Sequence, residues 1–160
     1  MKARLVIAGV LTLVVGAAGC TRTSDAATPS PARYPAEARF RSAGGSTSML
    51  HVAVARSDAE KQRGLMGVRS LPDDAGMAFV WTEPTDSAFW MKDTRIPLSI
   101  AFASRDGRIE TIREMTPCAG DPCPLYRSSA PFVLAIEANA GWYDAHGVRV
   151  GDHVTLEDTG

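Results

Sequence analysis

The dipeptide Asp106-Gly107 is the feature that most constrains the fold of this chain, because it separates two runs that contain alternating apolar residues. "LSIAFA" (98–103) precedes it and "RIETIREM" (108–115) follows it. Asp-Gly is typical of tight hairpin turns, since their central residues need a positive φ that glycine adopts without strain. The sequence therefore predicts an antiparallel hairpin of two strands over these runs.

Other short apolar runs are spread along the chain and are separated by Gly, Pro, Asp and Ser. They predict strands over 48–55, 76–81, 87–94, 132–139 and 152–157. Ser57 and Glu60 have the spacing of a capping box, which predicts a short helix that ends near Gly64. A second helix or turn is expected over 140–147. No strand–helix–strand alternation is visible, so we do not expect a parallel sheet. We predict a mainly β protein, with a single antiparallel β-sandwich or jelly-roll-like domain and one or two short peripheral helices.

The N-terminal residues have the pattern of an export signal. Lys2 and Arg4 precede an apolar stretch over 5–15, and "GAAGC" brings small residues up to Cys20. We expect a signal peptide over 1–19, a lipid anchor on Cys20 with a flexible tether over 20–38, and one β domain over 39–160. A plain secreted chain and a retained N-terminal anchor remain open. The expected location is the extracytoplasmic cell envelope, with the lipid holding the protein to a bacterial membrane.

With Cys20 assigned to the lipid anchor, two cysteines remain, Cys118 and Cys123 in "CAGDPC". Gly120 and Pro122 allow this span to fold back, and an exported chain meets an oxidising compartment, so we expect a disulfide that shapes a loop. A two-cysteine metal site and a redox pair are the alternatives.

The stretch "FWMK" (89–92) places Phe89 and Met91 on one face of a strand and Trp90 and Lys92 on the other. A buried face would not accept lysine readily, and a fully exposed face would not favour tryptophan. We therefore expect Phe89 and Met91, like Phe79, to lie in the core. We expect Trp90 to form the apolar floor of a wet concavity with Lys92 at its edge.

Seven segments occur in a fixed order along the chain: "RGLMGV", "GMAFVW", "FWMKDT", "IPLSIAF", "DGRIETI", "AIEANAG" and "GVRVGDHV". Together they resemble the Domain of Unknown Function 192 family over about residues 49–156. The resemblance implies one compact, mainly β domain similar to a jelly roll, and it implies no biochemical activity.

Two positions bear on what the resemblance implies about chemistry. Members of the family commonly carry an aspartate after "IPL", where this chain has Ser99, so a carboxylate that served chemistry in relatives is missing here. Asp93 stands where many relatives carry asparagine, which suggests a polar and not an essential acidic role. The resemblance therefore extends to fold and pocket and not to a mechanism.

We expect a binding or accessory domain and not an enzyme. The ligand would be a small polar molecule or peptide, because an aromatic floor with a cationic rim suits sugar-like or peptide-like groups with acidic substituents. Glu137 is the expected countercharge to Lys92 or Arg63, although an outward-facing glutamate fits the strand equally well. No cofactor is expected. Acidic and basic residues nearly cancel, at a net charge of −1, so nucleic acid is not expected as a partner. The expected site residues are Arg63, Met66, Trp90, Lys92, Asp93 and Glu137.

Two alternatives from other functional classes remain. Met66, Met77, Met91 and Met115 could act as soft ligands for copper(I), although methionine is ordinarily a core residue. An envelope hydrolase could use Asp93, Glu137 and Asp152, but the histidines are scattered and no Gly-x-Ser-x-Gly motif is present.

Overall fold

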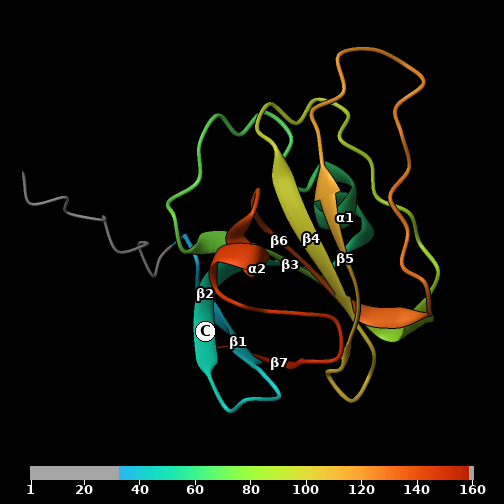
Figure 1. Cartoon of the computed structure of the whole chain (residues 1–160). Helices are drawn as coiled ribbons and strands as arrows, with labels where there is room; N and C mark the ends of the chain where they lie inside the picture. The colour runs from blue at the N-terminus through green and yellow to red at the C-terminus, as the bar shows by residue number, and fades with distance from the viewer. Residues whose placement is uncertain (1–32, 159–160) are drawn as a thin grey trace, which may run out of the picture.

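The computed structural model describes residues 33–158, which form one mixed sheet of seven strands and two short helices (Figure 1). The prediction of a mainly β domain with short peripheral helices is confirmed. Neighbouring strands lie in the order β5-β4-β6-β3-β2-β1-β7. The elements are β1 (Ala36–Arg41), β2 (Thr47–Ala55), α1 (Asp58–Arg63), β3 (Ala75–Thr85), β4 (Leu98–Ala103), β5 (Ile109–Met115), β6 (Phe132–Asn139), α2 (Trp142–Ala145) and β7 (His153–Asp158).

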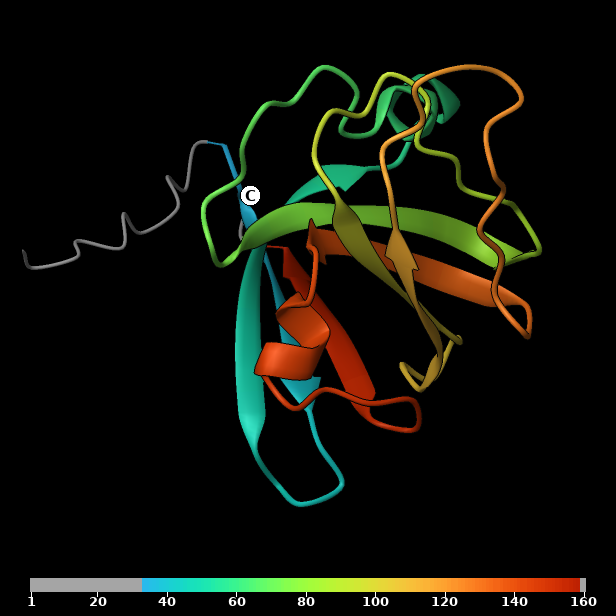
Figure 2. The same cartoon turned by 45° about the horizontal axis from the view of Figure 1, so that its top comes forward.

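The sheet is strongly curled, so that β1 and the first part of β2 run at a steep angle to β3 (Figure 2). Its two edge strands, β5 and β7, meet at one end through a bridge between Arg108 and His153. Val154 donates its amide to the carbonyl oxygen of Gly107 at 2.8 Å, next to the predicted β4–β5 hairpin turn. The curled sheet is therefore partly closed into a barrel.

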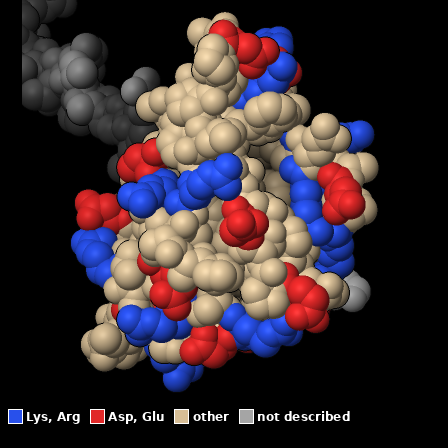
Figure 3. Space-filling model, turned by 90° about the vertical axis from the view of Figure 1, so that its right-hand side faces the viewer, with Lys and Arg blue, Asp and Glu red and all other residues tan. Residues whose placement is uncertain are grey.

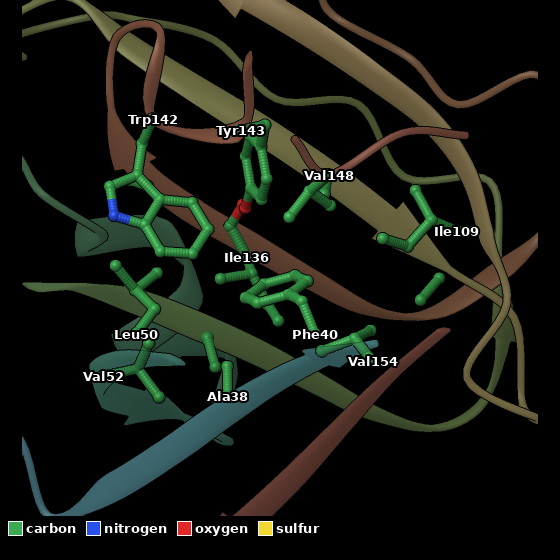
Figure 4. Packing of buried hydrophobic residues seen from close by; sticks show 14 of the residues in the cluster. Ala38, Phe40, Leu50, Val52, Ile109, Ile136, Trp142, Tyr143, Val148 and Val154 are labelled. Atoms are coloured by element: carbon green, nitrogen blue, oxygen red, sulfur yellow. The ribbon is translucent and has the colours of Figure 1, made fainter. Parts of the chain in front are cut away.

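Curling produces two apolar clusters on opposite faces of the central strands. The inner cluster draws residues from all seven strands and is covered by α2, whose Trp142 and Tyr143 lie over Phe40 (Figure 4). The Tyr143 hydroxyl donates to the carbonyl oxygen of Ile136 at 2.7 Å, which satisfies this buried group. The outer cluster contains Phe79, Met91, Phe102 and Phe132. Alternation along β4 and β6 assigns successive residues to the two clusters.

One pair of strands differs from the antiparallel arrangement expected from the sequence. β2 and β3 are parallel, with His51 opposite Ala75 and Ala55 opposite Phe79. The connection between them carries α1, and a parallel pair needs such a crossover to return the chain to the same end of the sheet. The helix is only six residues long. For this reason the sequence showed no clear strand–helix–strand pattern.

The predicted strand over 87–94 is wrong. This segment makes isolated bridges, Phe89 with Tyr126 and Lys92 with Cys118, and joins no strand of the sheet. The physical reason lies in β3, because Gly76–Phe79 already pair with β2 on one edge and with β6 on the other. The segment that follows β3 therefore cannot form a hairpin with this part of the strand.

The first strand begins three residues before the predicted start of the domain at residue 39. β1 begins at Ala36 and pairs on both sides, with β2 and β7. Ala36 and Ala38 are fully buried and Phe40 is nearly so. Alanine has a weak preference for strands, and this concealed the alternation. The signal region and Cys20 lie outside the described residues.

Candidate functional site

A pocket of about 330 Å³ lies on the outer face of the sheet, between α1, the segment 86–97 and strands β3 and β6. We call it the aromatic pocket. Its volume falls at the lower end of the range typical of small-molecule sites. The residues that form its walls and rim include Lys61, Arg63, Leu65, Met66, Phe79, Trp81, Phe89, Trp90 and Glu137.

The helix at the rim is held by its caps. The Ser57 hydroxyl accepts from the Glu60 amide at 3.3 Å, and the Glu60 carboxylate accepts from the Ser57 amide at 2.8 Å. The hydrogen bonds that the Glu60 carboxylate accepts from the Ser57 amide, the Arg56 amide and the Ser57 hydroxyl lower its pKa to about 2. The predicted capping box is confirmed, and Gly64 ends the helix. Because α1 has no buried residue, its caps and the Lys61 ammonium, 4.9 Å from the Trp81 ring centre, keep it in place.

The segment 86–97 forms the second wall. Phe89 and Tyr126 exchange two backbone hydrogen bonds, of 2.9 and 2.8 Å, which fasten the segment to the loop after β5. Met91 points into the outer cluster and is 1% exposed, whereas Trp90 is 42% exposed. The predicted alternation of "FWMK" is therefore kept, although its residues belong to no sheet strand.

The loop between β5 and β6 (residues 116–131), which we call the cysteine loop, supports the wall formed by the segment 86–97. Cys118 and Cys123 form a disulfide, with their Cα atoms 5.7 Å apart. The Lys92 ammonium donates to Asp121 of the same loop at 3.0 Å, and this contact raises the pKa of Lys92. Cys118 thus holds the backbone of the segment 86–97, and Asp121 holds the Lys92 side chain.

Glu137 lies at the sheet side of the aromatic pocket. It stands on β6 opposite Met77 of β3 and Ile100 of β4, and its side chain is on the face of the outer cluster. It is only 4% exposed, and burial raises the pKa of its carboxyl to about 8. The strands come very close here, because a Cβ on Gly76 would overlap the carbonyl oxygen of Glu137.

The Glu137 carboxylate has no hydrogen-bond or ion-pair partner among the described residues. No fully enclosed side-chain oxygen in residues 33–158 lacks a partner, so the Glu137 oxygens must reach the open space of the pocket. Buried carboxylates are ordinarily paired or hydrogen-bonded. Glu137 is therefore a buried carboxyl group that faces the pocket without a protein partner.

The structure brings all six predicted site residues around two adjoining hollows. Arg63, Met66, Trp90 and Glu137 line the aromatic pocket. A shallower side pocket, which shares Arg63, Met66 and Trp90 with it, is also lined by Lys92 and Asp93. This gathering leaves ligand binding itself a prediction.

The expected pairing of Glu137 with Lys92 or Arg63 is wrong. Lys92 directs its ammonium to Asp121, and no ion pair joins Glu137 to either cation in the described part of the chain. Sequence reasoning also missed Lys61 and Trp81 as pocket residues. The register could have indicated Trp81, because it follows Met77 and Phe79 at alternate positions on β3 and Met77 lies opposite Glu137.

The backbone explains the residue type at Asp93. Its φ is 56°, in the left-handed region that Asn and Asp tolerate better than other side chains. Its carbonyl oxygen accepts from the Gly67 amide at 2.9 Å, which joins the segment to the turn after α1. A conformational role accounts for the exchange of aspartate and asparagine implied by the family resemblance.

Ser99 lies on the inner face of the sheet, away from the aromatic pocket. Its hydroxyl donates to Glu114 at 2.6 Å and accepts from the amide of Gly141, which precedes α2, at 2.8 Å. Ser99 pairs with Ala138, whereas the neighbouring Ile100 pairs with Glu137. The difference from the family pattern at this position therefore leaves the pocket unchanged.

The methionines considered as copper ligands lie in one region, where apolar packing accounts for them: Met77, Met91 and Met115 belong to the outer apolar cluster, and Met66 lines the aromatic pocket. Of the acidic residues considered for hydrolysis, Asp93 and Glu137 line the two adjoining pockets, and Asp152 lies apart from them. Asp152 accepts from the amides of Ala43 and Arg149 and so has a structural role, far from Glu137 in the order of strands. Residues 33–158 contain no group of three or more His, Cys, Asp or Glu residues suited to a metal ion. Over the same residues, no helix has the length and apolarity needed to cross a membrane.

Comparison with known proteins identifies the family. Residues 39–156 match DUF192, whose description is "Uncharacterized ACR". The chain belongs to the DUF192 family. The predicted resemblance is thereby confirmed over nearly the whole described domain.

Two solved structures are similar to this DUF192 chain. One, from Sinorhizobium meliloti 1021, is provisionally described as a transcription regulator; it is 32% identical, with a TM-score of 0.71, over 78% of this chain and 95% of that one. The other, a protein of unknown function from Novosphingobium aromaticivorans DSM 12444, is 29% identical, with a TM-score of 0.68, over 74% and 83% of the two chains. No curated protein matches the sequence.

Proposed function

We propose that this protein is an exported binding module whose aromatic pocket takes up a small sugar-like or peptide-like ligand. The observation that carries the proposal is the combination of several aromatic rings with one inward-facing carboxylate in a pocket of about 330 Å³. Rings provide flat apolar contact, and a few polar groups fix the orientation of a ligand. Lys61 and Arg63 add positive charge at the rim, where an acidic substituent would be accepted.

The location outside the cytoplasm is part of the proposal. Lys2 and Arg4, the apolar stretch over 5–15 and the small residues before Cys20 support export and lipid attachment. A disulfide agrees with an oxidising compartment. Fatty-acid labelling of the native chain and of Cys20→Ser tests the anchor, because only the native chain should take up label.

The description of the Sinorhizobium relative suggests DNA binding as a competing function. The charge distribution favours the small-ligand proposal instead. Basic and acidic side chains are interspersed over the face shown in Figure 3, and the net charge of the chain is −1. DNA-binding surfaces ordinarily concentrate basic residues.

Tryptophan fluorescence tests the proposal directly. Trp81 and Trp90 line the aromatic pocket, whereas Trp142 lies in the inner cluster. Titration with a panel of short peptides, amino acids, amines and sugars should give a saturable fluorescence change with at least one class. Trp90→Ala should weaken that binding, while Met49→Ala, which shortens an exposed apolar residue elsewhere, should leave it unchanged. Equal binding by both variants, or no saturable change with any class, would contradict the proposal.

A further inference from the structure

We propose that the ligand enters the aromatic pocket with an ammonium group, which forms an ion pair with the Glu137 carboxylate. The inference rests on the binding function proposed above and adds the chemical class of the ligand. It excludes neutral sugars and selects amines, including the amino ends of peptides.

The first argument is the missing partner of Glu137. The residue is 4% exposed, yet none of the described residues donates a hydrogen bond to its carboxylate. The two cations that α1 places at the pocket have another partner or are exposed to solvent. The Lys61 ammonium donates to the Arg56 carbonyl oxygen at 2.6 Å, and Arg63 is exposed at the rim. Because an ionised carboxylate accepts only, a ligand that stabilises the ionised form of Glu137 must be a donor.

The second argument concerns the surroundings of this carboxylate. Phe79, Trp81, Phe89 and Trp90 line the same pocket. The faces of aromatic rings attract cations, and aromatic cages are a known means of recognising ammonium groups. Trp81 and Trp90 already have lysine ammonium groups 4.9 and 5.7 Å from their ring centres. A pocket of rings with one buried carboxylate therefore suits an ammonium better than a hydroxyl or a second carboxylate.

The third argument is protonation. Burial raises the pKa of Glu137 to about 8, so the free protein holds a proton there at neutral pH. An arriving ammonium stabilises the ionised form and displaces that proton into solvent. Below about pH 8 the affinity for an ammonium should rise with pH, by up to about tenfold per unit, and should then level off while the ligand amine stays protonated.

None of the described charged groups forms an ion pair with Glu137 in place of the ligand ammonium. Its neighbours across the sheet on β3 and β4, Met77 and Ile100, are uncharged, and the pocket residues of segment 86–97 are also uncharged. Tyr143 of α2 stays neutral, since burial raises its pKa well above the usual value. The remaining charged groups that line the two pockets are Asp58, Lys61 and Arg63 of α1, and Lys92 and Asp93 at the side pocket.

Three matched probes test the inference: 2-phenylethylamine, 2-phenylethanol and 3-phenylpropanoate, which share a ring and differ in their polar group. Titration calorimetry of the native protein should give binding of the amine that is at least about tenfold tighter than that of the alcohol or the acid. In two buffers of different ionisation enthalpy at pH 6.5, amine binding should release close to one proton. Glu137→Gln should lose the proton release and the pH dependence and bind the amine at least about tenfold more weakly.

Glu83→Gln is the matched control, because Glu83 is exposed and pairs with Arg105 outside the pocket. It should bind the amine as the native protein does. Tight binding of the alcohol or the acid that Trp90→Ala abolishes would overturn the ammonium assignment and leave the binding function standing. Absence of amine binding, or unchanged amine binding by Glu137→Gln, would also overturn the assignment. Failure of the whole fluorescence panel would instead reject the binding function.

Discussion

Glu137 lowers the stability of the folded state but offers the aromatic pocket a group for ligand binding. Its carboxyl is buried on β6 without a protein partner, and desolvation therefore favours the protonated form. A well-packed apolar residue at this position would avoid the cost of ionisation. The glutamate is compatible with the fold because its oxygens reach the aromatic pocket.

The raised pKa of Glu137 predicts a specific dependence of stability on pH. The folded-state pKa is about 8 and lies above the unfolded value near 4.3. The folded state therefore holds the extra proton between these values, and its stability should fall as pH rises from 5 to 8, by up to about 1.4 kcal/mol per unit. Urea unfolding of the native protein and of Glu137→Gln measures this, and the variant should show a flatter profile. Glu60, with its lowered pKa of about 2, affects only more acidic conditions. Parallel profiles of the two proteins would contradict the assignment.

At the scale of elements, the aromatic pocket depends on segments outside the sheet. α1 is held by its caps, and the segment 86–97 is held by the cysteine loop through Tyr126, Cys118 and Asp121. Local stability is low where few buried contacts are made, and ligand-binding loops are ordinarily drawn from such segments. The pocket thus combines a rigid floor, made by β3 and β6, with walls that rely on caps and a disulfide.

Removal of the disulfide should loosen the wall that carries Trp90. A double Cys118→Ser, Cys123→Ser variant should lose about 2 kcal/mol of stability, from the entropy of so short a loop. Hydrogen exchange followed by NMR should show faster exchange at the Phe89 and Tyr126 amides, which bond to each other's carbonyl oxygens. The Val148 amide, bonded to Tyr143 near α2, is the internal control and should keep its protection relative to global unfolding. Unchanged protection at Phe89 would show that the loop holds the wall without its disulfide.

At the scale of the whole molecule, the contact between β5 and β7 decides the shape of the sheet. It brings the two edges of a seven-stranded sheet together and encloses the inner cluster with α2. Partial closure of this kind also protects edge strands from pairing with other chains. The turn that makes the contact is the Asp106-Gly107 hairpin identified in the sequence.

Gly107→Ala should open this contact. Gly107 has a φ of +85°, and an added Cβ would overlap the carbonyl oxygen of Val154. The combined strain and overlap should lower stability by about 2–4 kcal/mol in urea unfolding. Gly45→Ala is matched in backbone angle, at +87°, but has no atom within 4 Å of the new Cβ, so it should cost only about 1 kcal/mol. Equal losses for the two variants would show that the β5–β7 approach adds nothing to stability.

The sequence by itself determined the features that depend on neighbouring residues. The Asp106-Gly107 hairpin, the capping box at Ser57, most strands and the alternation within "FWMK" were predicted correctly. Each follows from local backbone preference or from the twofold period of a strand. The Cys118–Cys123 pair was also predictable, because its loop is short enough to close on itself.

Only the tertiary structure decided which segments become neighbours. β2 and β6 occupy both edges of the first half of β3, and this excluded a hairpin between that part of β3 and residues 87–94 and placed Glu137 opposite Met77. Arg63, Met66, Trp90 and Glu137 were correctly expected in one region, but the pairing of Glu137 with a cation was not. Charge and spacing along a chain show only that two residues are able to form an ion pair. The direction in which each side chain points depends on backbone segments that are far away in the sequence. Lys92 meets Asp121 because the cysteine loop folds behind it, and Glu137 consequently faces the pocket without a partner.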